Sequence, residues 1–403
     1  MTTVCYNEQG VSIQRGKTGI VKSMKQYSIG HRGFWRTVMV MTVLITVTCL
    51  MSFIRSWADF YTDHIYIFVR EPLTRLTEKI PFPLGEILMY LGAFIIALAA
   101  VLLILLIFLH GKRRYRSFVS VYFRSLVIII LTMLLIYSLQ WLTPYKSSVL
   151  GDPSPSERSY TAAELRIIYL YVIDHLNEEC RNVPRDENGK VIYDPKEVTE
   201  EKAGIAMNGI SDEFPRLRGN YPSIKTALCS DVLEWMWIGG YTYPYTMEMT
   251  YNRYTDRFYF PTLYAHESSH HMGYYKEHEA NFLAYLACVT SDDPVLRYSG
   301  YYNILYYIDD DYYEACLASG AEDMYWNDIE EHPIDPQVIA DVIDASLEAD
   351  EAYQSEEHPL EDFADEATEI SEVGWDTQAQ ILQEYNYDGV VLLLLKYYDG
   401  KLY

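Results

Sequence analysis

Three long apolar stretches near the amino terminus constrain this chain more than any other feature. They cover residues 34–54, 87–109 and 118–142, and each reaches the roughly 20 residues that an α-helix needs to cross a bilayer. The polar lead before the first stretch is too long for a removed signal peptide, and no small-residue cleavage site follows the stretch. The sequence therefore predicts a multi-pass protein of the cell membrane with three spans and the lipid bilayer as a partner.

Basic residues predict how these spans are oriented. Six Lys and Arg side chains precede or open the first span, and residues 112–116 add four more between the second and the third. Positive residues favour the cytoplasmic side. We therefore expect the amino terminus in the cytoplasm and the following parts in order: a basic segment at 1–33, a three-span membrane domain at 34–145, a linker at 146–160 and an extracytoplasmic domain at 161–403.

Charge is distributed very unequally along the chain. Residues 1–150 hold 16 of the 32 basic and 6 of the 56 acidic side chains, which leaves 50 acidic against 16 basic side chains in residues 151–403. A domain this acidic would be repelled by a phosphate backbone, so we expect no nucleic-acid partner. It still holds most of the 38 Tyr and enough other apolar residues to bury a core.

Local patterns in the second half predict helices and a small sheet. Thr161 and Glu164 form a capping box before an amphipathic helix, and two more helices are expected, one near Pro336 and one over 390–395. Two adjacent glycines among aromatic residues indicate short strands joined by a turn within 235–251.

Residues 257–290 are expected to hold a strand and two helices. Residues 257–260 can supply the strand, and 261–290 have a helical pattern that breaks once, at Gly273. The four cysteines of the exterior half show no paired spacing that would indicate a cysteine zinc site. We favour buried free thiols there over one or two disulfides.

The most informative stretch is His266-Glu267-Ser268-Ser269-His270. On a helix, positions i and i+4 lie on one face, so the two imidazoles can bind one metal ion while Glu267 points at a water on that ion. Zn²⁺ suits these ligands and keeps one position open in catalytic sites. The pattern therefore predicts a zinc site that supports metal-assisted hydrolysis.

A catalytic zinc site needs a third protein ligand. Lys276 occupies the position where a metzincin has its third histidine, and an ammonium group cannot coordinate zinc, so this class is excluded. Two carboxylates follow at once. We favour Glu277 over Glu279, because Asn281 lies one turn later on the face of Glu277 and can orient it, whereas Glu279 shares its face with apolar residues.

Several segments together resemble a known family. They are 244–248, 260–262, the run His-Glu-Ser-Ser-His-His-Met-Gly at 266–273, 277–282 and 297–300. The chain resembles the bacterial membrane-protein family catalogued as domain of unknown function 3810 over most of its length. The resemblance implies a zinc metallopeptidase of the gluzincin type with no established substrate, and the Glu277-x-x-Ala-Asn281 element is similar to the ExxAN or ExxAD element that carries the glutamate ligand in gluzincins. We expect a mainly α fold: three transmembrane helices, then an α+β zincin-like domain with a small sheet and the HExxH helix.

The predicted function is that of a membrane-anchored zinc metallopeptidase acting outside the cytoplasm. Zn²⁺ would activate a water, Glu267 would act as general base, and a peptide or protein would be the substrate. Arg297, Tyr298 and Tyr301 are candidates for stabilising the oxyanion by sequence proximity only, and a structural role is favoured for each because the chain is rich in Tyr. Residues 239–248 are either the strand that pairs with an extended substrate or an ordinary hairpin. Two alternatives remain: a membrane-anchored binding or sensing module with a non-catalytic zinc site, and hydrolysis of a non-peptide amide bond in the cell envelope.

Overall fold

The fold is described from a computed structural model of the whole chain, covering residues 17–150, 160–359, 361–369, 371 and 388–403. About half of the predicted basic segment 1–33 and most of the predicted linker 146–160 therefore lie outside what is described below, at 1–16 and 151–159. Helix accounts for 72% and strand for 4%, so the class is mainly α, as predicted. The packing divides the chain into two compact units. Unit 1 contains Met1–Leu50 and Ala97–Leu135, and unit 2 contains Met51–Ile96 and Ile136–Tyr403.

Three helices are long and apolar enough to cross a membrane, as the sequence predicts. The candidate spans are Arg32–Ser52, Leu84–Leu109 and Arg113–Tyr145. The first is the apolar part of α1 (Lys17–Ser52), the second is α4 (Leu84–Leu109), and the third combines α5 (Arg113–Tyr137), η1 (Ser138–Leu142) and α6 (Thr143–Tyr145). Within unit 1, the Tyr115 hydroxyl of α5 donates to the Leu102 carbonyl of α4 at 2.7 Å, which ties these two helices together.

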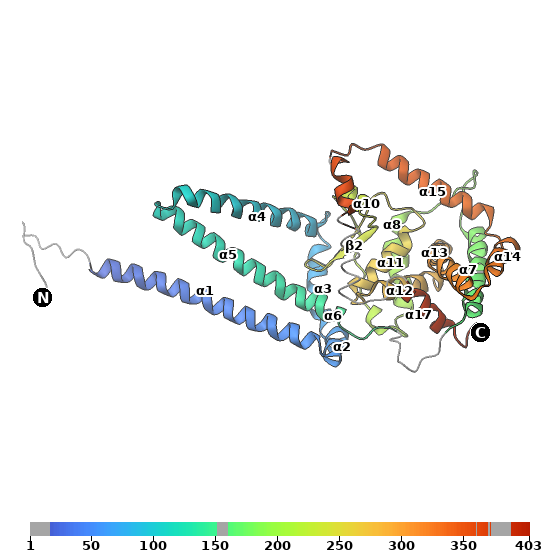
Figure 1. Cartoon of the computed structure of the whole chain (residues 1–403), viewed down its shortest axis with the longest axis horizontal. Helices are drawn as coiled ribbons and strands as arrows, with labels where there is room; N and C mark the ends of the chain where they lie inside the picture. Colours follow the sequence, from blue (N-terminus) through green and yellow to red (C-terminus); the bar gives the residue numbers. More distant parts are fainter. Residues whose placement is uncertain (1–16, 151–159, 360, 370, 372–387) are drawn as a thin grey trace, which may run out of the picture. The chain divides into compact units, whose positions relative to one another are not determined.

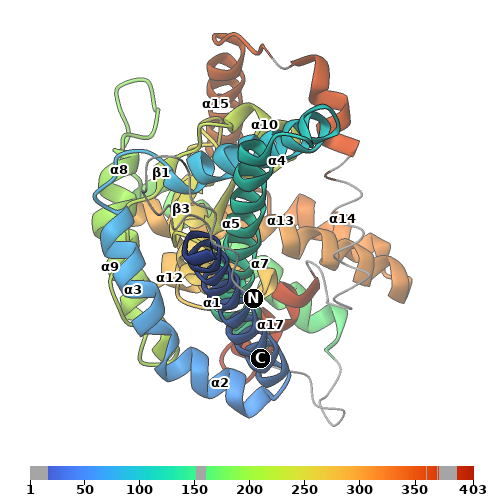
Figure 2. The ribbon, with the colours of Figure 1, turned by 90° about the vertical axis from the view of Figure 1, so that its left-hand side faces the viewer.

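Two further helices occupy the connection between the first two spans. They are α2 (Arg55–His64) and α3 (Tyr66–Thr77), and both belong to unit 2 (Figures 1 and 2). Tyr61 and Tyr66 of these helices form a buried cluster with Tyr145, Met247 and Tyr275. The connection between the spans is therefore part of the core of unit 2.

The largest core of unit 2 is helical. Its members are α7 (Ala162–Asn182), α11 (Phe260–His271), α12 (Glu277–Val289), α13 (Pro294–Ser319) and α17 (Asp388–Tyr398). The capping box predicted for α7 is present, because the Thr161 hydroxyl accepts from the Glu164 backbone and the Glu164 carboxylate accepts from the Thr161 backbone. The predicted helix at 390–395 is the buried part of α17, which packs on α12.

A three-stranded mixed sheet lies beside α11. Its strands are β1 (Lys225–Thr226), β2 (Gly240–Tyr243) and β3 (Glu248–Tyr251), in the order β1-β3-β2. β1 pairs parallel to β3, and β2 pairs antiparallel to β3 with Tyr243 opposite Glu248. The predicted hairpin is confirmed, and β2 is an edge strand of this sheet.

The strand predicted at 257–260 is wrong. The Asp256 carboxylate accepts hydrogen bonds from the backbone of Phe258 and Tyr259, which closes a turn, and α11 begins at Phe260. A short aromatic run suits a strand by composition, but the aspartate before it satisfies the same backbone groups locally.

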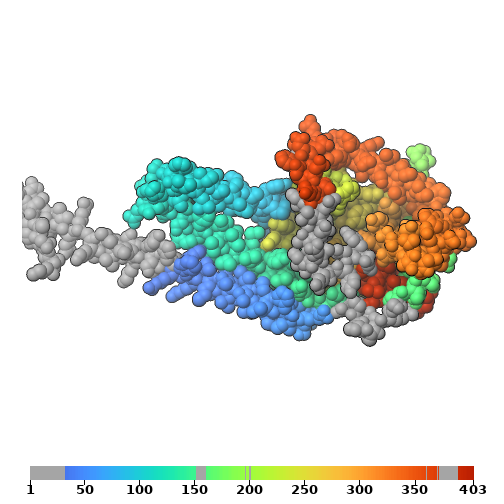
Figure 3. All heavy atoms as spheres, viewed as in Figure 1, coloured from blue at the N-terminus to red at the C-terminus, as the bar shows by residue number. Residues whose placement is uncertain are grey.

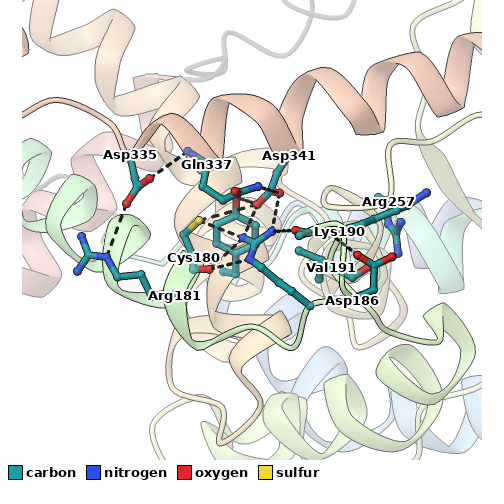
Figure 4. Close-up of polar contacts among 12 residues, drawn as sticks. Cys180, Arg181, Asp186, Lys190, Val191, Arg257, Asp335, Gln337 and Asp341 are labelled. Carbon is teal, nitrogen blue, oxygen red and sulfur yellow. Dashed lines mark hydrogen bonds and ion pairs between the residues drawn. The ribbon is translucent and has the colours of Figure 1, made fainter.

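Unit 2 contains further described elements, and those at 322–331 and 336–354 lie at the surface in the view of Figure 3. The further elements are α8 (Pro195–Glu197), η2 (Val198–Ala203), α9 (Gly204–Gly209), η3 (Pro215–Leu217), α10 (Ser230–Trp235), α14 (Glu322–Glu331), α15 (Pro336–Gln354) and η4 (Glu361–Phe363). Asp341 of α15 accepts two hydrogen bonds of 2.7 Å from Arg185, just past α7, and Figure 4 shows this carboxylate directed toward Cys180 of α7. The Cys180, Cys229, Cys288 and Cys316 thiols are free, as favoured from the sequence.

Candidate metal centre

A tight reversal brings two helices together at the candidate site. α11 ends at His271, Gly273 has a φ of +101°, and α12 begins at Glu277. This backbone conformation is in the left-handed region that favours glycine. The Tyr274 amide donates to the Ser269 carbonyl at 3.0 Å, so the chain turns back at once and α12 packs along α11. The break at Gly273 therefore brings the start of α12 beside the end of α11.

Three side chains meet across this reversal. His266 Nε2 lies 3.2 Å from one oxygen of the Glu277 carboxylate, and His270 Nε2 lies 3.5 Å from the other. The potential ligand atoms of the three residues all lie within 4.8 Å of one another. Both imidazoles are buried, whereas the Glu277 side chain is 49% exposed, so the group is accessible from one side. Two imidazole nitrogens and a carboxylate are a donor set that suits Zn²⁺.

The remaining ring nitrogens are already engaged. His270 Nδ1 lies 2.8 Å from the Tyr274 carbonyl, which can only accept, so Nδ1 carries the proton. His266 Nδ1 lies 2.7 Å from Asn281 Oδ1, while the amide nitrogen of Asn281 donates to Tyr307 at 3.3 Å. Nε2 is therefore the nitrogen of each ring that faces Glu277 and that a metal ion would take once it is free of its proton. Asn281 was expected to orient Glu277, but it orients His266 instead, because its amide reaches across to α11.

Charge within the group is balanced between the imidazoles and the carboxylate. Burial opposes ionisation of both partners, yet the imidazoles hold the pKa of Glu277 well below its usual range. Despite the same burial, the Glu277 and Glu267 carboxylates raise the pKa of His270 to about 9. Without a cation, the site therefore holds a proton on His270 that a metal ion would displace.

Glu267 lies on the same helix but has different surroundings. Its side chain is 2% exposed, and its carboxylate accepts a hydrogen bond of 2.9 Å from the Thr242 hydroxyl of β2. Burial raises the pKa of Glu267, which makes this carboxylate a better proton acceptor than an exposed one. Thr242 was not identified from the sequence. A hairpin was predicted there, but the residue that faces α11 depends on how the sheet packs on the helix.

The other predicted site residues lie elsewhere. Glu279 is buried and accepts a hydrogen bond of 2.5 Å from the Leu150 amide. Arg297 pairs with Glu179 of α7 at 2.8 Å, and the Tyr298 hydroxyl donates to Asp341 of α15 at 2.8 Å. Tyr301 is buried in the core between α7 and α12. Arg297, Tyr298 and Tyr301 therefore join α13 to its neighbours, which is the structural role favoured for them from the sequence.

A layer of side chains behind α11 was missed from the sequence. The Tyr275 ring stacks on His270 with centroids 6.0 Å apart, and its hydroxyl hydrogen-bonds to Tyr66 of α3 at 3.1 Å. Arg70 of α3 is 2% exposed and donates to the Met272 sulfur at 2.6 Å. His271 is fully buried, and burial, reinforced by the nearby Arg70 charge, lowers its pKa well below the usual value, so this imidazole is neutral. His271 is therefore a neutral packing residue of this layer.

A large cavity adjoins the centre. It measures about 1310 Å³, and its lining includes Asn281, which contacts His266, and Tyr307, which contacts Asn281, as well as Tyr259, Trp237 and Tyr306. The Trp237 and Tyr306 side chains are 85% and 77% exposed, so the cavity has an aromatic, accessible rim. Such a concave and mostly apolar site with a few polar groups is suited to binding an organic ligand.

Comparison with known proteins yields one relationship. No curated protein and no solved structure matches the chain. One family model, described as "Protein of unknown function (DUF3810)", matches residues 61–369, which include the end of α2, the whole of α3, the sheet and the His266–Glu277 group. The match covers more than half of the residues of the chain, so the chain belongs to the DUF3810 family.

Proposed function

We propose that this protein is a membrane-anchored zinc-dependent metallopeptidase of the gluzincin type, acting on the extracytoplasmic side. The observation that carries the proposal is the convergence of His266, His270 and Glu277 within 4.8 Å, with the buried Glu267 carboxylate on the same helix. The orientation rests on the basic residues around the spans. Because α11 lies outside the three candidate spans, cleavage within the bilayer is not favoured.

His266, His270 and Glu277 would hold the ion. When bound, Zn²⁺ acts as a Lewis acid and makes water a better nucleophile at neutral pH. Asn281 and the Tyr274 carbonyl keep both imidazoles in the required tautomer. The Glu277 carboxylate supplies the negative charge that holds a cation between two neutral rings.

Glu267 would move the proton. Its carboxylate accepts a proton from the attacking water and passes it to the leaving nitrogen of the peptide. Thr242 fixes one oxygen of this carboxylate at 2.9 Å and leaves the other to take the proton. The β2 edge adjoins this carboxylate, and an extended substrate can pair with it through backbone hydrogen bonds.

The test is Glu267→Gln in the full-length protein. We expect about one zinc per chain in both proteins and a loss of peptidase activity of at least about a hundredfold in the variant. His266→Ala should lose the zinc, whereas Glu279→Gln, which alters a carboxylate bound to Leu150, should keep it. A wild-type protein without bound metal would overturn the proposal.

The second candidate is a binding or sensing module with a non-catalytic zinc site. It is favoured if zinc binds but Glu267→Gln changes neither a peptidase activity nor a cellular phenotype. Three protein ligands argue against this alternative, because structural zinc sites usually fill the fourth position with protein.

A further inference from the structure

The candidate metal centre lies close to the end of the third candidate span, at Tyr145. Trp141, in the last turns of the third span, contacts Tyr275 with ring centroids 6.3 Å apart, and Tyr275 in turn stacks on His270 at 6.0 Å. One aromatic ring therefore separates the end of a span from a proposed metal ligand.

A second contact joins the end of the third span to the residue that precedes α12. Lys276 directly precedes Glu277, and its ammonium group lies 3.7 Å from the centroid of the Tyr145 ring. The Lys276 side chain is only 7% exposed, so this cation–π contact is shielded from water. The connection between the two helices that carry the candidate ligands is thus packed on the last turns of the third span.

The edge strand β2 leads from the cavity to the second span. Tyr243, at the end of β2, packs against the first turn of α4, where a Cβ on Gly85 would overlap its ring. The neighbouring Glu248 accepts hydrogen bonds from the Leu84 and Gly85 amides at 3.0 and 2.8 Å, which caps the start of α4. At its other end β2 follows Trp237, which lines the 1310 Å³ cavity.

A buried carboxylate fixes this arrangement. Glu86 of α4 is fully buried and accepts hydrogen bonds from the Leu228 and Cys229 amides and from the Tyr241 hydroxyl of β2. Removing a charge-assisted network of this kind from its partners is costly, so β2 and the start of the second span move as one piece. The edge strand beside the candidate site is therefore held next to the start of the second candidate span.

From these contacts we infer that the substrates are extended, membrane-proximal segments of polypeptides that are themselves anchored in the bilayer, cleaved within about six residues of the anchor. This inference rests on the proposed peptidase function. Thr242, which hydrogen-bonds to Glu267, directly precedes Tyr243, and the Tyr243 ring contacts the start of the second span. A strand advances about 3.3 Å per residue. A segment paired with β2 would thus reach the bilayer surface within a few residues of Glu267, while its other end would enter the aromatic cavity.

The test uses the full chain in vesicles of phosphatidylcholine and phosphatidylglycerol. The probe is a library of random ten-residue targets in three forms: joined to a leucine-rich span through two residues, joined to the same span through a flexible spacer of 25 residues, and free in solution. Both ends of the target are anchored in separate sets, because a strand can pair in either direction. Cleavage sites are mapped by mass spectrometry, and Glu267→Gln is the control in every case.

We expect the short-stalk form to be cleaved at least about ten times faster than the free form, because a shared membrane raises the effective concentration. Its cleavage sites should lie within about six residues of the span. Cleavage of the long-stalk or free forms, with the short-stalk form left intact, would overturn this inference and leave the peptidase function standing. If zinc-containing protein shows no Glu267-dependent cleavage of any of the three forms, the peptidase function itself is overturned.

Discussion

Zinc binding should release a proton from His270, and Glu277 should determine that release. In the metal-free protein the pKa of His270 is raised to about 9, because the Glu277 and Glu267 carboxylates outweigh the cost of burying a charge. A metal ion needs Nε2 of this ring without a proton. Between about pH 6.5 and pH 9, binding must therefore displace one proton from His270, and the apparent affinity should rise with pH.

The size of the effect follows from the pKa. At pH 7.5 a group with a pKa of about 9 is almost fully protonated, so about one proton should leave His270 for each zinc bound. The apparent affinity for zinc should rise about tenfold per pH unit, or about thirtyfold between pH 6.5 and pH 8. In Glu277→Gln the burial that lowers the pKa of His270 remains while the largest cause that raises it is gone, so this pKa should fall to its ordinary value near 6.5 or below. The release at pH 7.5 should then fall to about 0.1 proton.

The measurement is calorimetric titration of zinc into the full-length protein at pH 7.5, in buffers that differ in ionisation enthalpy. The slope of the observed enthalpy against buffer enthalpy gives the number of protons released. Glu279→Gln is the matched control, because this glutamate lies two residues away and its carboxylate bonds to the Leu150 amide instead. A wild-type affinity that does not change between pH 6.5 and pH 8, or a full proton released by Glu277→Gln, would refute the reasoning.

Three more predictions concern side chains around the centre. Burial raises the pKa of Glu279 to about 7, so the folded protein holds an extra proton between about pH 4.5 and pH 7 and loses stability as the pH rises through that window. At pH 8, Glu279→Gln should therefore unfold at a higher temperature than the wild type, with a gain in the free energy of unfolding of up to about 3 kcal/mol. This gain should be absent at pH 4. Arg70→Ala leaves a cavity and removes the donor to Met272, so it should cost about 3 kcal/mol of stability. Arg75→Ala is the control, because Arg75 is 71% exposed and pairs with Glu71, and its effect should stay within about 0.5 kcal/mol. Equal melting temperatures for the two variants would contradict the packing of α3 on α11. Thr242→Val should lower kcat about tenfold with zinc content unchanged, because it removes the hydroxyl that orients Glu267, and an unaltered kcat would show that this hydrogen bond is not needed.

The features that could be predicted from sequence are those encoded by neighbouring residues. The spans follow from apolar length, the start of α7 from Thr161 and Glu164, and the reversal between α11 and α12 from Gly273. Helical periodicity also separated Glu277 from Glu279, since only the former shares a face with Asn281. Each of these signals needs no more than one or two helical turns of sequence.

The features that were missed depend on contacts between distant segments. Arg297 and Tyr298 carry groups that suit an oxyanion site, but Glu179 and Asp341, one well before and one well after them in the chain, take up those groups. Nothing near residue 297 in the sequence indicates either partner. A side chain's chemistry therefore limits what it can do, while the tertiary partners decide what it does.

The helices between the first two spans show why this limit matters most near the centre. Residues 55–77 have mixed charge and contain a proline, and Arg is rarely buried without a partner. In the fold, Arg70 is buried with the adjacent Glu71 as its ion-pair partner at 2.9 Å, while the His271 carbonyl and the Met272 sulfur, 201 and 202 residues away, accept from its guanidinium at the end of α11. The same end of α11 carries His270, so the burial of Arg70 and the placing of a candidate ligand are satisfied by one packing arrangement. A segment that looks like a linker thus supports the centre from behind, and a chain starting after the third span would lack that support.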